Sequence, residues 1–552
     1  MLKNWLRNWR INFVLGVILL LGAAIISRLV FLQIINHDFY KALATGQQGE
    51  FEAVKGDRGQ VFFSKGDILA TNVKAMYVYI CPEEIKNKEE TAEKLSAILG
   101  IDKEQIYEKA QKDSLFERIK NVLTEQEVSA ITDLDLAGVY IKENALRNYP
   151  QEQMASQVVG FVGGEGIGQY GVEGFYDDFL QGEEEFMRNS LVNNLNGSDI
   201  FLSIDYNLQF TAEKLLLQSK EQVDIEGGQI IVIDPNNGKI LALAEYPGFN
   251  PNYYFKVDNF NLFQNSVAQK LFEPGSILKP ITMASALDLG KVNPDTTYLD
   301  EGTVKIGGYI IENYNSRIFG QVTMTEVLEK SINTGAVFVE KQVGHETFLE
   351  YLDRFGFFES TGIDIQGEVF SENKELKKGY EVNFATASFG QGIEITPIQL
   401  VRAFSVIANG GKLVKPFVVE KIVDKNGQEI VTEPVLSDKI ISSNAISKLT
   451  AMLVSVVENG FGKAAKIPGY YIAGKTGTAQ ISWSVLGENK KGYSNKTWQS
   501  FMGFFPAFNP RFLVLIKLDN PKTNTAEYSA VPLFKQLAKY MIDYYAIPPD
   551  YE

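Results

Sequence analysis

One short motif in this chain combines the residue types needed for nucleophilic chemistry. Ser276-Ile277-Leu278-Lys279 has the form Ser-x-x-Lys and is followed by Pro280 and an apolar run typical of a helix. If a helix begins at Ser276, Pro280 falls in its first turn, where a missing N–H does little damage. The i, i+3 spacing then places the Ser276 hydroxyl and the Lys279 amine on one face.

A serine hydroxyl needs a neighbouring base before it can attack a carbonyl carbon. The chain has two histidines, His37 and His345, and neither lies near a plausible nucleophile in the sequence, so we expect a base other than imidazole. Lys279 can serve if it is uncharged. Burial, the positive end of the helix and a second lysine nearby would all lower the pKa of Lys279.

Two further motifs complete a set. Ser331-Ile332-Asn333 has the form Ser-x-Asn, and Lys475-Thr476-Gly477-Thr478 lies inside a run typical of a β-strand, where glycine allows another backbone to approach closely. Each motif alone carries little information, because Ser-x-Asn also suits a helix cap. The order Ser-x-x-Lys, Ser-x-Asn, Lys-Thr-Gly is the set found in penicillin-binding proteins and class A β-lactamases.

Second copies of two motifs have simpler interpretations. Ser371-Glu372-Asn373-Lys374 lies in a charged stretch without apolar periodicity, which predicts a solvated turn. Ser442-Ser443-Asn444 is typical of a helix cap. We therefore place the nucleophile at Ser276.

The elements that position these motifs fall into two groups of strands separated by helical stretches. Gln229–Ile233 and Lys239–Ala244 are β runs joined by a hairpin signal, and Phe501–Phe505 and Phe512–Leu518 are β runs much later in the chain. A helix is expected from Val531 to Tyr545. Strands at both ends with helices between them predict an α/β (α+β) domain in which an antiparallel sheet packs against helices.

Composition limits the function classes. The chain has 552 residues, 45% of them hydrophobic, which is enough for two or three globular units. The formal net charge of -15 argues against nucleic acid or an anionic lipid surface as the main ligand. The single cysteine, Cys81, is expected to be a small buried hydrophobe. We expect no metal and no cofactor.

The N-terminal region predicts a membrane anchor. We assign residues 1–10 to the cytoplasm and residues 11–35 to a single transmembrane helix, since the basic residues Lys3, Arg7 and Arg10 precede the apolar stretch. A cleaved signal peptide is the alternative, because Ala42-Leu43-Ala44 has the small-x-small form of a cleavage site. Residues 40–204 are expected to form a pedestal without chemistry of its own, containing a surface helix capped by Thr124 and Glu127. Residues 205–552 form the catalytic domain.

Further segments extend the likeness beyond the three motifs. They are Phe389–Gly392, Thr396–Leu400, Asn409–Gly411, Asp234–Gly238 and Pro247–Pro251 in the catalytic domain, and Arg58-Gly59 and Gly171–Gly174 in the pedestal. With these segments the chain resembles the class B penicillin-binding proteins over nearly its whole length. The resemblance implies a pedestal of the dimerisation-domain type and a catalytic domain of the serine β-lactamase type that acts as a peptidoglycan D,D-transpeptidase.

The resemblance also implies a role for each motif residue. Ser276 would attack the penultimate D-Ala of a stem peptide ending in D-Ala-D-Ala, and Lys279 would take its proton. Ser331 would relay a proton to the leaving amine, while Asn333 would hold the substrate peptide. Lys475 is the fifth catalytic residue and would supply positive charge. The substrate-binding residues are Thr476, Gly477 and Thr478, of which the two threonines would bind the terminal carboxylate. Backbone N–H groups of Ser276 and Thr478 would form the oxyanion hole.

The same resemblance implies partners and location. Stem peptides and β-lactams would acylate Ser276, and a membrane glycosyltransferase of the shape, elongation, division and sporulation type would supply glycan, alongside divisome or elongasome proteins. The catalytic domain would lie on the outer side of a bacterial plasma membrane, with a septal role favoured by Arg354–Glu368 and Phe501–Asn509. The alternatives are a D,D-carboxypeptidase or β-lactamase that uses water, and a non-catalytic division scaffold or β-lactam sensor.

Overall fold

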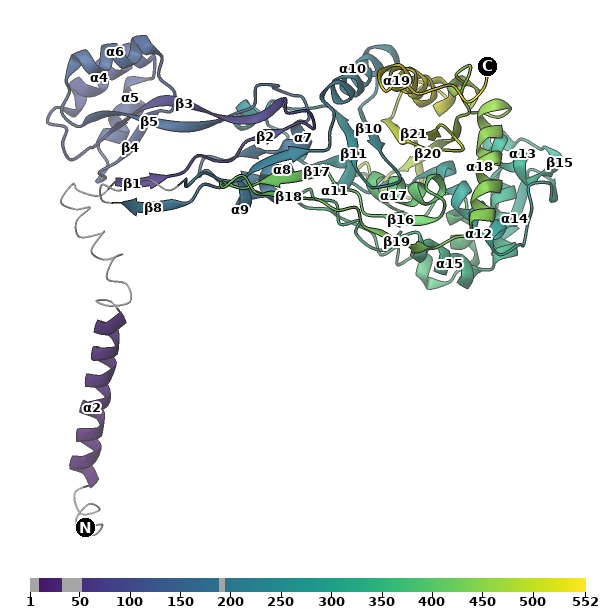
Figure 1. The fold of residues 1–552 in the computed structure, drawn as a ribbon, viewed down its shortest axis with the longest axis horizontal. Helices are drawn as coiled ribbons and strands as arrows, with labels where there is room; N and C mark the ends of the chain where they lie inside the picture. Colours follow the sequence, from purple (N-terminus) through teal and green to yellow (C-terminus); the bar gives the residue numbers. More distant parts are fainter. Residues whose placement is uncertain (1–8, 32–51, 188–193) are drawn as a thin grey trace. The chain divides into compact units, whose positions relative to one another are not determined.

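The structure, a computed structural model, describes residues 9–31, 52–187 and 194–552 (Figure 1). The chain divides into two compact units, Met1–Arg58 with Gln181–Gly197, and Gly59–Leu180 with Ser198–Glu552. The boundary that we predicted between residues 204 and 205 lies inside the second unit, so the four-part division of the chain stays a prediction.

The first unit contains one helix and one strand pair among its described residues. Helix α2 spans Trp9–Val30, and β1 (Glu52–Lys55) pairs antiparallel with β8 (Glu184–Met187). Helix α2 covers most of the predicted transmembrane segment 11–35, whose residues 32–35 lie outside the described ranges, as does His37. Within the described parts of the chain, no helix reaches the combination of length and apolar character needed to cross a membrane.

The N-terminal part of the second unit has its own small core. Strand β3 (Ile68–Ile80) pairs antiparallel with β5 (Val139–Asn148) along its length and with β4 (Glu117–Lys120) at its end. Buried side chains of these strands pack with those of α4 (Lys88–Leu99), α5 (Lys103–Ala110) and α6 (Glu125–Leu134). The predicted capping box is confirmed, because Thr124 and Glu127 hydrogen-bond each other's backbone N–H groups. Cys81 is buried, as expected.

A mixed sheet joins this part to the C-terminal domain within the second unit. Strand β2 (Val61–Phe62) pairs with β3 and runs parallel to β9 (Asp199–Leu202), which pairs with β17 (Val419–Val423) and through it with β18 (Glu429–Val431). Close by, Arg147 and Glu173 form a buried ion pair with Nε and Oε1 2.6 Å apart. Shorter elements follow or cross this region: α7 (Ser156–Val159), β6 (Phe161–Val162), β7 (Gly168–Gln169), α8 (Gly171–Phe175), α9 (Asp177–Leu180), β16 (Lys412–Val414) and β19 (Leu436–Lys439).

The C-terminal domain is built on a five-stranded antiparallel sheet in the order β11-β10-β22-β21-β20. The predicted early hairpin is confirmed as β10 (Gly227–Ile233) and β11 (Ile240–Tyr246). The late runs are β20 (Ala473–Ser482), β21 (Tyr493–Phe505) and β22 (Phe512–Asp519). Strand β22 lies in the centre and joins the early strands to the late ones. Strand β20, which carries Lys475–Thr478, lies at the edge.

Helices cover both faces of this sheet, which explains the uninterrupted apolar run of β22. Successive residues of a strand point to opposite faces. Leu513 and Leu515 belong to one core, and Val514 and Ile516 belong to the other. The second core includes α10 (Tyr206–Val223) and α19 (Ala530–Tyr544), close to the predicted 531–545 helix. The first includes α12 (Lys279–Asp288), α17 (Pro397–Ala408) and α18 (Ser443–Glu458) (Figure 1).

The C-terminal domain has further short elements. They are α11 (Ser266–Gln269), α13 (Met324–Glu329), α14 (Asn333–Val343), α15 (His345–Arg354) and α16 (Glu381–Ala387), and two antiparallel strand pairs, β12 (Thr297–Asp300) with β15 (Gly320–Thr323) and β13 (Thr303–Ile306) with β14 (Tyr309–Glu312). His345 is the first residue of α15. Ser442 caps α18 by accepting the Ala445 N–H, as its motif suggested.

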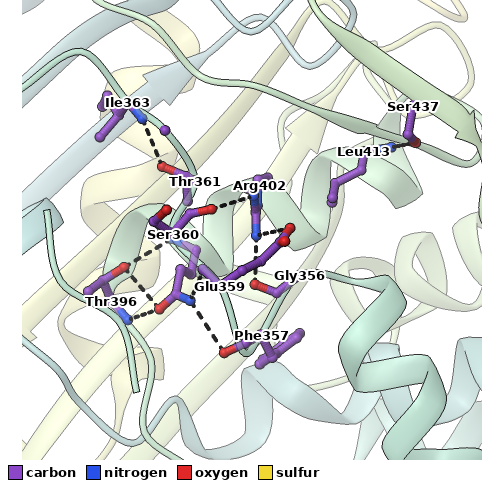
Figure 2. Close-up of polar contacts among 12 residues, drawn as sticks. Gly356, Phe357, Glu359, Ser360, Thr361, Ile363, Thr396, Arg402, Leu413 and Ser437 are labelled. Atoms are coloured by element: carbon purple, nitrogen blue, oxygen red, sulfur yellow. Dashed lines mark hydrogen bonds and ion pairs between the residues drawn. The ribbon is translucent and has the colours of Figure 1, made fainter. Parts of the chain in front are cut away.

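A buried arginine fixes the loop that follows α15. Arg402, on α17, donates to the carbonyl oxygens of Gly356 at 2.6 Å and Ser360 at 3.0 Å and pairs with Glu359 at 3.3 Å (Figure 2). The guanidinium therefore provides hydrogen-bond donors for carbonyl groups of the loop beyond the end of α15. Desolvation lowers the pKa of Arg402, and the neighbouring Glu359 opposes that shift.

Candidate active site

Ser276 lies on a tight turn that leads into α12. A 3-10 turn spans Gly275–Leu278, and the α-helix proper begins at Lys279, three residues later than the start we assumed. Pro280 does fall in its first turn, as predicted. Ile277 is fully buried while Ser276 is half-buried. In the described part of the chain no hydrogen bond reaches the Ser276 hydroxyl, so its oxygen is open to a substrate.

Lys279 is buried with its amine among polar oxygens. Its Nζ lies 2.5 Å from the Ser331 carbonyl oxygen and 2.8 Å from Asn333 Oδ1, with Ser331 Oγ at 3.2 Å. Burial, and secondly the positive charge of Lys475, hold the pKa of Lys279 well below its ordinary value. Three oxygen atoms face the Lys279 amine. Because an uncharged amine has only two N–H donors, loss of one proton replaces one of these contacts with a lone pair that can accept a proton from a hydroxyl.

Ser331 connects the two lysines of the site. It lies between α13 and α14 with φ of +52°, a left-handed conformation that is uncommon for residues other than glycine and that concentrates at functional sites. Its Oγ lies 2.9 Å from Lys475 Nζ as well as 3.2 Å from Lys279 Nζ. The Ser331 oxygen accepts from both amines, so its hydroxyl hydrogen is left for a ligand. Ser-x-Asn also suits a helix cap, and Ser331 does lie in the short link between two helices.

Lys475 is the charged residue that β20 contributes. Its side chain is fully buried, and burial lowers its pKa to about 7. Its Nζ also lies 3.1 Å from the Thr476 carbonyl oxygen and 3.3 Å from Thr476 Oγ1. Thr478 is half-buried, and its Oγ1 accepts the Ala526 N–H at 3.2 Å, so the hydroxyl hydrogen of Thr478 can be donated to a ligand.

Glycines allow the serine turn and the edge strand to pack backbone to backbone. A Cβ at Gly477 would lie 2.8 Å from Ile277 Cγ1 and 3.1 Å from the Pro274 carbonyl oxygen. Gly275 has φ of +57°, and a Cβ there would lie 2.9 Å from the Cβ of Ala479. The Gly275 N–H also donates to the Gly390 carbonyl oxygen at 3.0 Å. Ser276 is thereby held beside the Lys-Thr-Gly strand.

Glu273, three residues before Ser276, belongs to this site and was not predicted to do so. Its carboxylate accepts hydrogen bonds from the Tyr493 hydroxyl, at 3.0 Å, and the Gly392 N–H, at 3.2 Å. It therefore ties the segment before Ser276 to β21. Burial raises the pKa of Glu273 to about 7. Glu-Pro-Gly before the serine was the available signal, but its partner Tyr493 lies too far along the chain to be foreseen.

The structure thus brings the predicted residues together. Hydrogen bonds connect Lys279, Ser331, Asn333, Lys475 and Thr476. The residues on either side of Ser276 in its turn, Pro274 and Ile277, pack against Gly477. The second Ser-x-x-Lys copy is different, because its Lys374 is exposed and pairs with Glu372 at the surface. A free hydroxyl, a buried amine whose pKa is lowered and a strand edge are suited to acyl transfer through a covalent serine ester.

Comparison with known proteins agrees with this chemistry. Residues 228–539 match the family described as penicillin binding protein transpeptidase domain, and residues 53–198 match the penicillin-binding protein dimerisation domain. The chain is 32% identical to stage V sporulation protein D of Bacillus subtilis (strain 168) over 93% of this chain and 82% of that protein. It is 28% identical to peptidoglycan D,D-transpeptidase FtsI of Buchnera aphidicola, over 100% of this chain and 97% of that protein.

A solved structure extends the likeness to three dimensions. The crystal structure of penicillin binding protein 3 from Mycobacterium tuberculosis, complexed with ampicillin, is 25% identical to the chain with a TM-score of 0.72, and the match covers 90% of this chain and 97% of that one. The transpeptidase family match alone spans more than half of the chain. The chain therefore belongs to the class B penicillin-binding proteins.

Proposed function

We propose that the protein is a serine-type peptidoglycan D,D-transpeptidase that cross-links stem peptides through an acyl-enzyme on Ser276. The observation that carries the proposal is the amine of Lys279. It is buried, its two N–H donors have acceptors in Ser331 and Asn333, and it lies one helical turn from an open serine hydroxyl. Removing the hydroxyl proton is the step that a serine nucleophile requires.

The reaction proceeds in two halves. Ser276 Oγ attacks the carbonyl carbon of the penultimate D-Ala while its proton passes to Lys279. The terminal D-Ala then leaves as an amine, taking a proton through Ser331. An amine of a neighbouring stem peptide attacks the ester in turn, forms the new amide bond and releases Ser276 with its proton restored. A β-lactam would stop after the first half, because its ring opens onto Ser276.

The other residues bind the substrate. Asn333 would hold the peptide backbone, and Lys475 would attract the terminal carboxylate, which the hydroxyls of Thr476 and Thr478 would bind. The N–H groups of Ser276 and Thr478 would stabilise the oxyanion, a contribution of about 3 kcal/mol for each donor. The position of β20 at the sheet edge supports this assignment, since an edge strand has backbone groups free for a ligand.

We further propose a single-pass membrane anchor at residues 11–35, with residues 40–204 as a pedestal and residues 205–552 as the transpeptidase domain outside the bacterial plasma membrane. The uncharged stretch Ile11–Ser27 and the basic residues before it support the anchor. Glycan polymerisation would come from a membrane glycosyltransferase partner, together with divisome or elongasome proteins. A septal role is supported by the division-type character of Arg354–Glu368.

Labelling with a fluorescent penicillin tests the nucleophile. The wild-type protein and Ser371→Ala, which alters the second Ser-x-x-Lys motif, should be labelled equally, while Ser276→Ala should show no band. Persistent labelling of Ser276→Ala would assign the nucleophile elsewhere and overturn the proposal.

A second assay separates transpeptidation from hydrolysis. A stem pentapeptide ending in D-Ala-D-Ala is incubated with the protein, with and without an acceptor stem peptide, and the products are weighed by mass spectrometry. We expect a cross-linked peptide with the acceptor. Release of D-Ala with no cross-linked product under any acceptor concentration would favour the carboxypeptidase alternative.

A further inference from the structure

Helix α14 begins at the site without a cap of its own. The residue before it, Ile332, is fully buried and offers no side-chain hydrogen bond. The first N–H groups of a helix have no partner inside the helix and need one elsewhere. Here Asn313 supplies it, because its Oδ1 accepts the N–H of Asn333 at 2.9 Å and that of Thr334 at 3.1 Å. Asn313 directly follows β14, so the cap comes from a distant segment.

A buried carboxylate fixes the orientation of the Asn313 amide. Asn313 Nδ2 lies 2.9 Å from Asp300 Oδ1 and 3.0 Å from Asp300 Oδ2. Asp300 also accepts the Thr334 hydroxyl at 2.6 Å and the Phe319 N–H at 2.8 Å. Both Asp300 and Asn313 are buried, so their unpaired forms would be costly. With its nitrogen on Asp300, the amide has to present its oxygen to α14.

The same segment also orients the side chain of Asn333. Asn333 Nδ2 donates to the Glu312 carbonyl oxygen at 3.0 Å, which leaves Asn333 Oδ1 facing Lys279 Nζ at 2.8 Å. Glu312 and Asn313 therefore hold Asn333 by its side chain and by its backbone N–H. The hydrogen bonds run without a break from Asp300 to the amine of Lys279.

We propose that Asp300 and Asn313 are positioning residues that hold Asn333, and through it the Lys279 amine, in the geometry that lets Ser276 react. The inference rests on the acyl-enzyme function proposed above. The Ser331 carbonyl oxygen and Asn333 Oδ1 make the two shortest contacts of the Lys279 amine, so they set the direction in which its lone pair points when the amine is uncharged. If Asn333 shifts, the amine turns toward a different acceptor and the lone pair leaves the line of attack.

Two isosteric variants and their combination test this role. Asn313→Asp keeps an oxygen for the α14 N–H groups but places a second carboxylate against Asp300. Asp300→Asn takes away the carboxylate that orients the Asn313 amide. The double variant restores one carboxylate and one amide with their places exchanged. The rate of acylation by a fluorescent penicillin is measured from about pH 6 to 10 for each protein.

We expect both single variants to be acylated about tenfold more slowly near neutral pH and to recover toward the wild-type rate near pH 9, because a displaced amine is more exposed to water and holds its proton more strongly. The double variant should return to within about threefold of wild type. Glu301→Gln, which removes an exposed carboxylate next to Asp300, should keep the wild-type profile.

The design separates positioning from a direct effect of charge. Lys475 on β20 is the charged group that shifts the pKa of Lys279, while the contacts from Ser331 and Asn333 are neutral. One single variant adds a negative charge and the other removes one, so simple electrostatics would move their pH profiles in opposite directions. Loss of positioning should move the pH profiles of acylation in both single variants in the same direction.

Three results would overturn the inference. They are unchanged profiles in both single variants, profiles that move in opposite directions, and a uniform loss at every pH that matches the unfolded fraction seen by circular dichroism. These outcomes differ from failure of the proposed function, which would appear as labelling of Ser276→Ala whatever happens at Asn313.

Discussion

Replacing Gly477 with alanine should slow the acylation of Ser276 in a protein that still folds. The added Cβ would lie 2.6 Å from Ser500 Oγ, 2.8 Å from Ile277 Cγ1 and 3.1 Å from the Pro274 carbonyl oxygen. The Ser500 hydroxyl can rotate away. Ile277 and Pro274 belong to the turn that carries the nucleophile, so relieving those contacts moves Ser276 itself.

The contact distances set the size of the effect. An ordinary carbon contact of about 3.5 Å requires the turn to retreat from Gly477 by about 0.7 Å. A misplacement of about 1 Å costs about 100-fold in rate, so we expect a loss of about 25-fold. Overpacking of this kind lowers the free energy of unfolding by about 1–3 kcal/mol.

Two measurements on the same protein samples test this reasoning. The second-order rate constant for acylation by a fluorescent penicillin reports on geometry, and urea denaturation reports on the free energy of unfolding. Gln480→Ala, an exposed position on the same strand, is the control and should leave both quantities unchanged. If Gly477→Ala folds and is acylated within about threefold of wild type, the close packing of strand and turn does not position the nucleophile.

Three further predictions concern charge. Lys279→Arg places a guanidinium, which keeps its proton, where an uncharged base is needed. The rate of acylation should therefore fall by about 100-fold or more and should no longer rise with pH. An active variant would exclude Lys279 as the base. Arg147→Met breaks the buried ion pair with Glu173 and should lower the free energy of unfolding in urea by more than the exposed Glu143→Gln does, whose cost should stay below about 1 kcal/mol. Equal losses would contradict this. Burial raises the pKa of Glu273 from 4.5 to about 7, so between these pH values the folded protein binds a proton that the unfolded chain has lost. The free energy of unfolding should therefore fall as pH rises across that range. Glu273→Gln, which cannot bind this proton, should make the fall smaller.

Local sequence signals predicted much of the fold because its strands are long and apolar. The hairpin of β10 and β11 and the runs in β21 and β22 all follow from such patterns. Two features of the domain could not be predicted in this way. The order of the strands depends on which distant strands pair. The 3-10 turn before Lys279 depends on packing against β20.

The candidate site was predicted as far as its motifs extend. Ser331, Asn333 and Lys475 lie with Lys279, as their order in the chain suggested. Asp300 and Asn313 were not predicted, because a buried aspartate and asparagine have no motif and act through tertiary hydrogen bonds. The left-handed backbone conformation of Ser331 could not be predicted from the sequence either, because it is imposed by the helices on either side.

The central place of β22 has a consequence for how the protein is made. The ribosome makes β10 and β11 about 270 residues before β22, the strand that lies between β10 and β21 in the sheet. The pairing of Gln229 with Lys517 therefore spans nearly the whole domain. A growing chain therefore exposes an unpaired apolar strand edge until its last segments emerge. Chains truncated before residue 512 should therefore be prone to aggregation and proteolysis, even though they already contain Ser276, Ser331 and Lys475 on β20.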